Sequence, residues 1–362
     1  MRILLAGGGT GGPVSPLLAV AEEIKKIAPS AKFCFVGTKK GPERQMVQSF
    51  KIPFYNIPAG KLRRYYSWQN FISPLFIAAG FIKSLYLLKK IKPDCVFGAG
   101  SFAQVPLIWA AWVLKIPSLI HQQDIIPSLA NKLCQMPASK ITVTFQESLK
   151  DFSNNLGLFY FKHKVDKLVC TGNPIKAPLK AISKHVALEY FHLSKDLPVL
   201  LVLGGGTGSL FINKLIADSL PKLGQIVQII HSTGKNKGQV AETLSYKPFE
   251  FIDRMDMAFA AADIVLSRAG LSTISELSFY KKTAIIIPLP RTHQIANAEY
   301  LEFKQAALVM PQELMTPEAL IYVTRRLLFK YELQEKSSKN IGTIMPHDAS
   351  EKIAKIIIKL IG

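Results

Sequence analysis

Two stretches of the sequence, LLAGGGTGG at residues 4–12 and LVLGGGTGS at residues 201–209, have the composition of a phosphate-binding loop. In each, an apolar run leads into glycines and a threonine, and an amphipathic segment follows, which predicts strand, tight loop and helix. Glycines let the backbone approach a ligand, and the start of a helix offers unpaired N–H groups to an anion. Neither is a strict GxGxxG, so each could simply close a tight turn. Two copies, one in each half, favour two Rossmann-like domains facing each other across a cleft.

A third glycine-containing loop, SRAGLSTISE at residues 267–276, follows an apolar run and opens a helix. Its first helical turn is a second place for phosphate. Glu276 lies one turn into that helix, where its carboxylate can accept two hydrogen bonds from a vicinal diol such as a ribose. The alternative is a carboxylate that only stabilises the positive end of the helix.

Two further motifs in the second half carry groups suited to a base and a sugar. FIDRM at residues 251–255 could hold a planar base through the Phe251 ring and the backbone that follows it. HQIANA at residues 293–298 brings the neutral hydrogen-bonding side chains of His293, Gln294 and Asn297, which suit sugar hydroxyls. Alone, the second motif would only be a polar helix start.

Charge and cysteine content restrict the partners and the compartment. The chain of 362 residues has a formal net charge of +20, and residues 1–175 hold 22 basic and only 8 acidic side chains. This excess favours an anionic partner, and the positive mean hydropathy favours a membrane surface over nucleic acid, for which no motif is present. Four cysteines without a CxxC pair indicate buried thiols in a reducing cytoplasm, with neither disulfides nor zinc.

Apolar runs alternate with helical patterns throughout, which predicts parallel sheets covered on both faces. The expected strands are residues 3–6, 32–36, 95–98, 118–121 and 141–144 in the first half, and 198–203, 226–231, 249–251, 263–267 and 283–288 in the second. A proline-containing segment, residues 171–178, reads as a linker between domains of residues 1–175 and 176–344. An amphipathic helix within residues 345–362 should return to the first domain.

Residues 61–92 break this pattern. Basic and aromatic side chains precede a nearly uninterrupted apolar run, residues 71–88, and lysines follow it. The run is slightly short for a bilayer span and fits a helix at a membrane interface. The membrane contacts expected from it are Arg63, Arg64, Trp68, Phe76, Phe81, Leu85 and Lys89. A buried helix behind a solvated basic loop is an equally good interpretation.

Seven motifs occur in the order and spacing of the MurG family, and the chain resembles that family from end to end. They are GGTGG, HQQDIIPSLANKL at residues 121–133, TGNPIK, GGGTGS, FIDRM, SRAGLSTISE and HQIANA. The resemblance implies a GT-B fold and an inverting transfer of GlcNAc from UDP-GlcNAc to the C4 hydroxyl of undecaprenyl-pyrophosphoryl-MurNAc-pentapeptide, which makes lipid II for the cell wall. It implies no metal or other cofactor, and a peripheral enzyme on the cytoplasmic face of the bacterial inner membrane. The sequence also contains no DxD motif for a metal.

The resemblance also implies residue roles, with the acceptor and membrane on the first domain and UDP-GlcNAc on the second. Glu276 corresponds to the ribose ligand and Ile252 to the uracil contact through its backbone. The remaining implied donor contacts are Thr10, Gly11, Gly12, Lys176, Gly206, Thr207, Leu271, Ser272, His293, Gln294 and Asn297. The implied acceptor contacts are Gly11, Gly12, Ser101, Phe102 and Asp124.

Four changes depart from the family pattern, three of them on the acceptor side. Pro13 follows GGTGG where the family has histidine, Ser101-Phe102 replaces Gly-Tyr, HQQD replaces HEQN, and Lys176 replaces arginine. Because Pro13 cannot accept a proton, we expect Asp124, just after a strand, to be the catalytic base, with His121 as the second candidate.

Other functions remain open from the residues alone. They are a GT-B transferase that acts on another lipid and a nucleotide-binding membrane protein without transferase activity. A dehydrogenase is disfavoured, because residues 35–38 end the second strand without the acidic side chain that binds a dinucleotide ribose.

Overall fold

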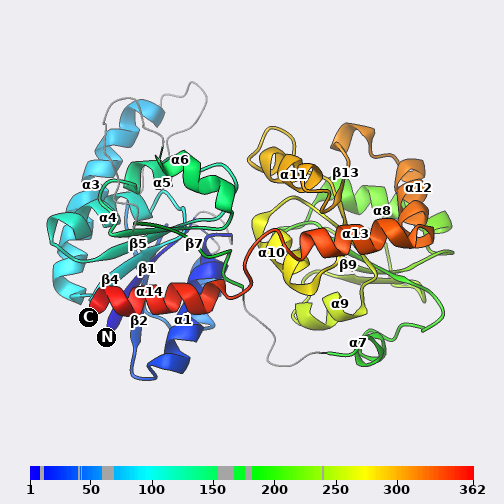
Figure 1. The fold of residues 1–362 in the computed structure, drawn as a ribbon, viewed down its shortest axis with the longest axis horizontal. Helices are drawn as coiled ribbons and strands as arrows, with labels where there is room; N and C mark the ends of the chain where they lie inside the picture. The colour runs from blue at the N-terminus through cyan, green and yellow to red at the C-terminus, as the bar shows by residue number, and fades with distance from the viewer. Residues whose placement is uncertain are drawn as a thin grey trace. The chain divides into compact units, whose positions relative to one another are not determined.

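The computed structural model describes residues 1–8, 12–39, 41, 43–58, 69–153, 167–175, 182–238 and 240–362. The chain divides into two compact units, of which the first comprises Met1–Lys176 with Met345–Gly362 and the second Ala177–Ile344 (Figure 1). Each unit contains a parallel sheet packed against helices, which confirms the predicted α/β class with two Rossmann-like domains.

The first unit has a seven-stranded sheet in the order β3-β2-β1-β4-β5-β6-β7. Its strands are β1 (Arg2–Ala6), β2 (Lys32–Gly37), β3 (Phe54–Asn56), β4 (Cys95–Gly98), β5 (Ser118–Gln122), β6 (Lys140–Val143) and β7 (Leu168–Cys170). Its helices are α1 (Val14–Ile27), α2 (Glu43–Gln48), α3 (Gln69–Ile91), α4 (Gln104–Val113), α5 (Leu129–Cys134), α6 (Leu149–Ser153) and α14 (Ala349–Ile361). The strand order reverses between β1 and β4, and in such sheets ligands bind beyond the carboxyl ends of the strands at that point.

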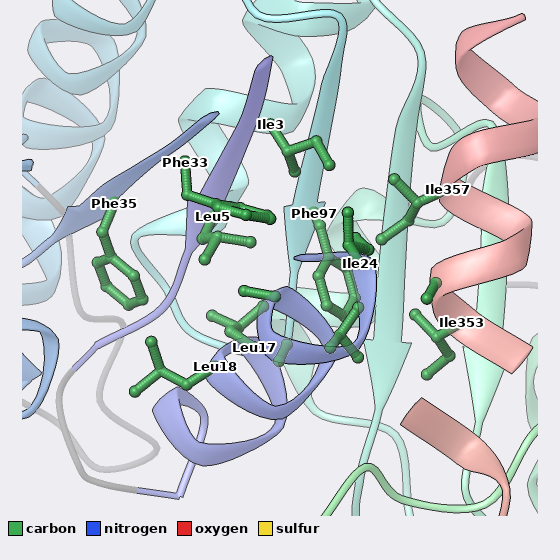
Figure 2. Packing of buried hydrophobic residues seen from close by; sticks show 14 of the residues in the cluster. Ile3, Leu5, Leu17, Leu18, Ile24, Phe33, Phe35, Phe97, Ile353 and Ile357 are labelled. Atoms are coloured by element: carbon green, nitrogen blue, oxygen red, sulfur yellow. The ribbon is translucent and has the colours of Figure 1, made fainter. Parts of the chain in front are cut away.

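The two faces of this sheet carry separate apolar clusters. Successive residues of a strand point to opposite faces, so Ile3 and Leu5 join one cluster and Leu4 and Ala6 the other. Figure 2 shows the first cluster, where Ile353 and Ile357 of α14 lie beside side chains of α1 and the sheet. The C-terminal helix therefore packs on the first unit, as predicted, with Lys352, Lys355 and Lys359 on its exposed side.

The second unit has a six-stranded parallel sheet in the order β10-β9-β8-β11-β12-β13. Its strands are β8 (Val199–Leu203), β9 (Gln228–Ser232), β10 (Tyr246–Phe249), β11 (Ile264–Ser267), β12 (Thr283–Ile286) and β13 (Leu308–Val309). Its helices are α7 (Lys184–Tyr190), α8 (Leu210–Leu223), α9 (Met255–Ala261), α10 (Leu271–Tyr280), α11 (Gln294–Phe303), α12 (Pro317–Phe329) and α13 (Tyr331–Ile341). The strand expected at residues 249–251 lies earlier, because Tyr246 is the buried residue and Phe251 is exposed.

Each sheet buries one histidine, and this should make the protein sensitive to acid. His121 on β5 and His231 on β9 are fully buried, and burial lowers the pKa of each from 6.5 to about 4. Unfolding lets these rings take up protons below pH 6.5, so their contribution to stability is complete above that pH and is lost as the pH falls towards 4. At about pH 4.5 each histidine should cost about 2–3 kcal/mol of unfolding free energy.

Chemical unfolding of the wild type and of His231→Gln at about pH 7 and about pH 4.5 measures this effect. The variant should lose less stability on acidification than the wild type. Equal losses in the two proteins would contradict the assignment of a neutral, buried His231.

Candidate active site

The loop that joins β8 to α8, residues 204–209, presents its backbone to solvent. Gly205 and Gly208 have φ angles of +88° and +72°, which favour glycine. A Cβ on Gly208 would lie 2.1 Å from the carbonyl oxygen of Thr233, so no larger residue fits there. Gly206 and Thr207 are exposed, and no atom lies within 4 Å of the place a Cβ would take on Gly206. The loop can therefore bring peptide N–H groups close to a ligand.

A second helix begins beside this loop. β8 and β11 are neighbours where the strand order reverses, so the loop after β11 opens at the same edge of the sheet. Gly270 caps α10 in an extended conformation, Leu271 is buried and Ser272 is half-buried. Two helix N-termini, those of α8 and α10, thus follow neighbouring strands, an arrangement suited to a diphosphate.

Glu276 has a partly buried carboxylate that forms no hydrogen bond or ion pair in the part of the chain that the structure describes. Its side chain is partly buried on α10, and burial raises its pKa to about 7. No described residue donates a hydrogen bond to it. A carboxylate withdrawn from water in this way is stabilised when ligand hydroxyls donate to it. This favours the ligand role over a simple helix-end carboxylate.

The FIDRM motif follows β10 at the carboxyl edge of the same sheet. Ile252 is buried, whereas the ring of Phe251 is 69% exposed. The Ile252 side chain thus anchors the segment, and the neighbouring Phe251 ring lies open to a planar group.

Of the three polar side chains expected to bind sugar in the HQIANA motif, one is exposed and two form hydrogen bonds with the backbone. His293 is exposed at the start of α11, and the Gln294 Oε1 accepts from the N–H of Leu289 at 3.0 Å. Asn297 is buried, and its Nδ2 donates to the carbonyl oxygen of Ala269 at 3.1 Å. This bond ties Asn297 to the loop before α10, and the sugar contact expected at Asn297 stays a prediction.

In the first unit, three buried amide side chains connect the loops after β4 and β5. Gln104 Oε1 accepts from the N–H of Gly100 at 2.9 Å, and its Nε2 donates to Asn131 Oδ1 at 2.5 Å. Asn131 Nδ2 donates to Gln122 Oε1 at 2.6 Å, and Gln122 Nε2 donates to the carbonyl oxygen of Asp124 at 2.8 Å. Asp124 is half-buried in a loop whose backbone this network fixes.

His121 does not have the surroundings of a general base. Its Nδ1 lies 3.0 Å from Thr142 Oγ1 and its Nε2 lies 3.2 Å from Asn173 Oδ1. The ring is fully buried and its pKa is lowered to about 4. Both nitrogens are engaged inside the unit, so the second candidate for the base is corrected to a structural residue.

Ser101 also turns inward. It is 4% exposed, and its Oγ accepts from the N–H of Ala103 at the start of α4. Phe102 is half-buried against the apolar cluster of α3 and α4. The acceptor contacts expected at Ser101 and Phe102 stay predictions. Gly12 is described in the turn before α1, whereas Thr10, Gly11, Lys176, Arg63, Arg64 and Trp68 lie outside the described residues.

The long apolar helix α3 has one inward and one outward face. Phe81 and Leu85 are partly buried against the core, and the membrane contacts expected of them stay predictions. Phe76 and Lys89 are exposed, as expected, and so is Ile82.

No helix in the described ranges has both the length and the apolar character needed to cross a bilayer. The same ranges hold no group of three or more His, Cys, Asp or Glu side chains that could bind a metal ion.

Family models match both units. The glycosyltransferase family 28 N-terminal domain matches residues 3–143, and the family 28 C-terminal domain matches residues 199–357. A protein of Clostridium kluyveri is 35% identical over 365 residues, covering 99% of this chain and 99% of its own. A protein of Flavobacterium psychrophilum is 36% identical over 375 residues, covering 99% of this chain and 98% of its own. Both are named UDP-N-acetylglucosamine–N-acetylmuramyl-(pentapeptide) pyrophosphoryl-undecaprenol N-acetylglucosamine transferases.

Solved structures agree on the fold. Acinetobacter baumannii MurG matches with a TM-score of 0.73 at 23% identity, covering 99% of each chain. A UDP-GlcNAc 2-epimerase from Neisseria meningitidis, bound to UDP-GlcNAc, matches with a TM-score of 0.68 at 17% identity, covering 99% of this chain and 100% of its own. The fold is therefore GT-B, and the chain belongs to glycosyltransferase family 28, in the family of N-acetylmuramyl-(pentapeptide) pyrophosphoryl-undecaprenol N-acetylglucosamine transferases.

Proposed function

We propose that this protein transfers GlcNAc from UDP-GlcNAc to undecaprenyl-pyrophosphoryl-MurNAc-pentapeptide, the reaction for which its relatives are named. The single observation that carries the donor assignment is Glu276, a partly buried carboxylate without a described protein partner, one turn into a helix that starts beside the 204–209 loop. That spacing suits a nucleoside diphosphate, with the ribose diol on the carboxylate and the phosphates at the helix starts.

The proposed reaction inverts the anomeric carbon. The acceptor C4 oxygen loses its proton and attacks that carbon, while the bond from the carbon to the β-phosphate oxygen breaks and UDP leaves. We assign the proton acceptor to Asp124 and the stabilisation of the leaving charge to the N-termini of α8 and α10. A positioned base contributes about two to four orders of magnitude to such a step.

Transfer of labelled GlcNAc to an analogue of undecaprenyl-pyrophosphoryl-MurNAc-pentapeptide (lipid I), with and without EDTA, tests the proposal. Label should appear in the lipid at equal rates in both arms, and UDP-glucose should be a poor donor. Loss of transfer in EDTA would contradict the metal-independent mechanism. Failure to label the analogue, with UDP-GlcNAc still bound, would point to a different lipid acceptor.

We further propose that the outer faces of α3 and α4 hold the protein on an anionic membrane. These two helices pack on each other and leave apolar side chains exposed, namely Phe76, Ile82, Tyr86, Trp112 and Val113. Lys83, Lys89 and Lys90 are exposed on α3 beside them. Aromatic and basic side chains around an apolar surface are typical of interfacial binding.

Flotation with liposomes should therefore depend on anionic lipid and weaken at high salt, because each basic residue contributes about 1 kcal/mol near such a surface. Changing Ile82 and Tyr86 together to serine should reduce binding. The matched control changes Phe329 and Tyr331, which are exposed on the second unit, and should bind as the wild type does. Equal binding to neutral vesicles, or none to either kind, would show that this face does not dock on a membrane.

A further inference from the structure

Two cationic side chains hold consecutive residues of the 204–209 loop. Lys237 Nζ donates to the carbonyl oxygens of Thr207, at 2.7 Å, and Gly208, at 3.3 Å. The Arg268 guanidinium donates to Ser209 Oγ at 2.9 Å. Ser209 also caps α8, so both cations reach the start of that helix through loop atoms.

The backbone around Lys237 is fixed. Asn213 of α8 is buried, and its Nδ2 donates to the carbonyl oxygens of Thr233 and Lys237, each at 2.9 Å. Gly208 and Gly234 approach so closely that a Cβ on either would clash with the other's segment. The loop after β9 therefore holds Lys237 against the glycine loop before any ligand arrives.

Arg268 is buried among neutral groups. It is 6% exposed, and besides Ser209 it donates to the carbonyl oxygens of Ile287 and Pro288 and to Gln312 Oε1. Its guanidinium also lies over the Phe211 ring. Burial lowers the pKa of Arg268, as expected for a charge that no anion balances.

Neither cation forms an ion pair with a carboxylate among the described residues. A buried, unbalanced positive charge such as that of Arg268 is costly, and the half-buried charge of Lys237 lies at the same loop. An anion bound at the loop would offset both. The carbonyl bonds of Lys237 also occupy two loop oxygens that would otherwise be free to repel that anion.

Resting on the proposed function, we propose that Lys237 and Arg268 are positioning residues that hold the glycine loop and balance the charge of the UDP diphosphate from behind it. Neither needs to touch the nucleotide. Their effect on affinity should grow with the number of phosphates on the ligand, because a fixed charge acts on each phosphate and not on the nucleoside.

Calorimetric titration of UDP, UMP and uridine tests this on the full chain. Lys237→Gln keeps a hydrogen-bond donor without the charge and should weaken UDP binding about tenfold, UMP less, and uridine not at all. Arg268→Lys, which keeps the charge, should bind UDP more tightly than Arg268→Gln. Lys222→Gln, at the far end of α8, is the matched control and should bind as the wild type.

Equal losses for all three ligands in Lys237→Gln, or an unchanged UDP affinity, would overturn the proposal. Lys237 is half-buried near the surface, so its variant carries the test even where the Arg268 variants do not fold. If the wild type binds UDP more tightly than uridine and the Lys237 variant binds UDP equally well, only this inference is refuted. A wild type that binds no UDP would refute the proposed function as well.

Discussion

Replacing Asp124 by asparagine should lower kcat for GlcNAc transfer at least about a hundredfold and leave UDP-GlcNAc affinity unchanged. The carboxylate can accept the proton of the acceptor hydroxyl, whereas the amide of nearly identical shape cannot. Asp124 lies two residues beyond β5, and the Gln122 amide fixes its backbone. Steady-state kinetics with a lipid I analogue and separate donor-binding measurements give the two quantities.

The control for this change is Asp151→Asn, which removes an exposed carboxylate from α6 of the same unit. It should turn over as the wild type does. Wild-type turnover in Asp124→Asn would leave Asp124 as an acceptor-positioning residue at most.

Removing the Glu276 carboxylate with alanine should raise KM for UDP-GlcNAc at least about tenfold, since losing a charge-assisted hydrogen bond costs about 1.5–3 kcal/mol. Because the pKa of Glu276 is about 7, the wild-type KM should also rise as the pH falls below that value and the carboxylate takes up a proton. Glu276→Gln should have a raised KM that no longer changes over this range.

Stability measurements distinguish the expected loss of donor binding in the Glu276 variants from unfolding of the protein. The fold raises the pKa of Glu276 from 4.5, so its ionisation opposes folding: the penalty is absent below pH 4.5 and complete above pH 7. Glu276→Gln should therefore be more stable than the wild type at about pH 8 and equally stable at about pH 4. Glu335→Ala, an exposed carboxylate change on α13, should alter neither KM nor stability. An unchanged donor KM in Glu276→Ala would refute the ribose assignment.

Features that depend on only a few adjacent residues could be predicted from the sequence. Each glycine motif follows an apolar run directly, so the strands β1 and β8 and the 204–209 loop were recognisable, whereas residues 9–11 lie outside the described residues. Glu276 was placed correctly on a helix because it lies only about one and a half helical turns beyond Gly270, so local sequence decides its conformation. The C-terminal segment was recognisable as an amphipathic helix from its apolar stripe, which includes Ile353 and Ile357. Its return to the first unit was expected because such a helix often packs back on the first domain in two-domain folds of this kind.

Features that depend on distant partners could not be predicted. The hydrogen bonds of Asn297 and His121 involve Ala269 and Asn173, which only packing brings near them. Lys237 reaches a carbonyl 30 residues away, and Arg268 a hydroxyl 59 residues away. In α3 the apolar run has no polar stripe, so its sequence did not distinguish the inward faces of Phe81 and Leu85 from the outward one.

The most direct test of the central claim is the structure of the product made from UDP-GlcNAc labelled with ¹³C in the sugar and a lipid I analogue. NMR should show GlcNAc joined through its anomeric carbon to the C4 oxygen of MurNAc, with the anomeric configuration inverted relative to the donor. The same fold also occurs in UDP-GlcNAc 2-epimerases, so the sugar must be followed and not only UDP release. Label found in a nucleotide sugar epimerised at C2, in free GlcNAc, or in a linkage of retained configuration would contradict the account.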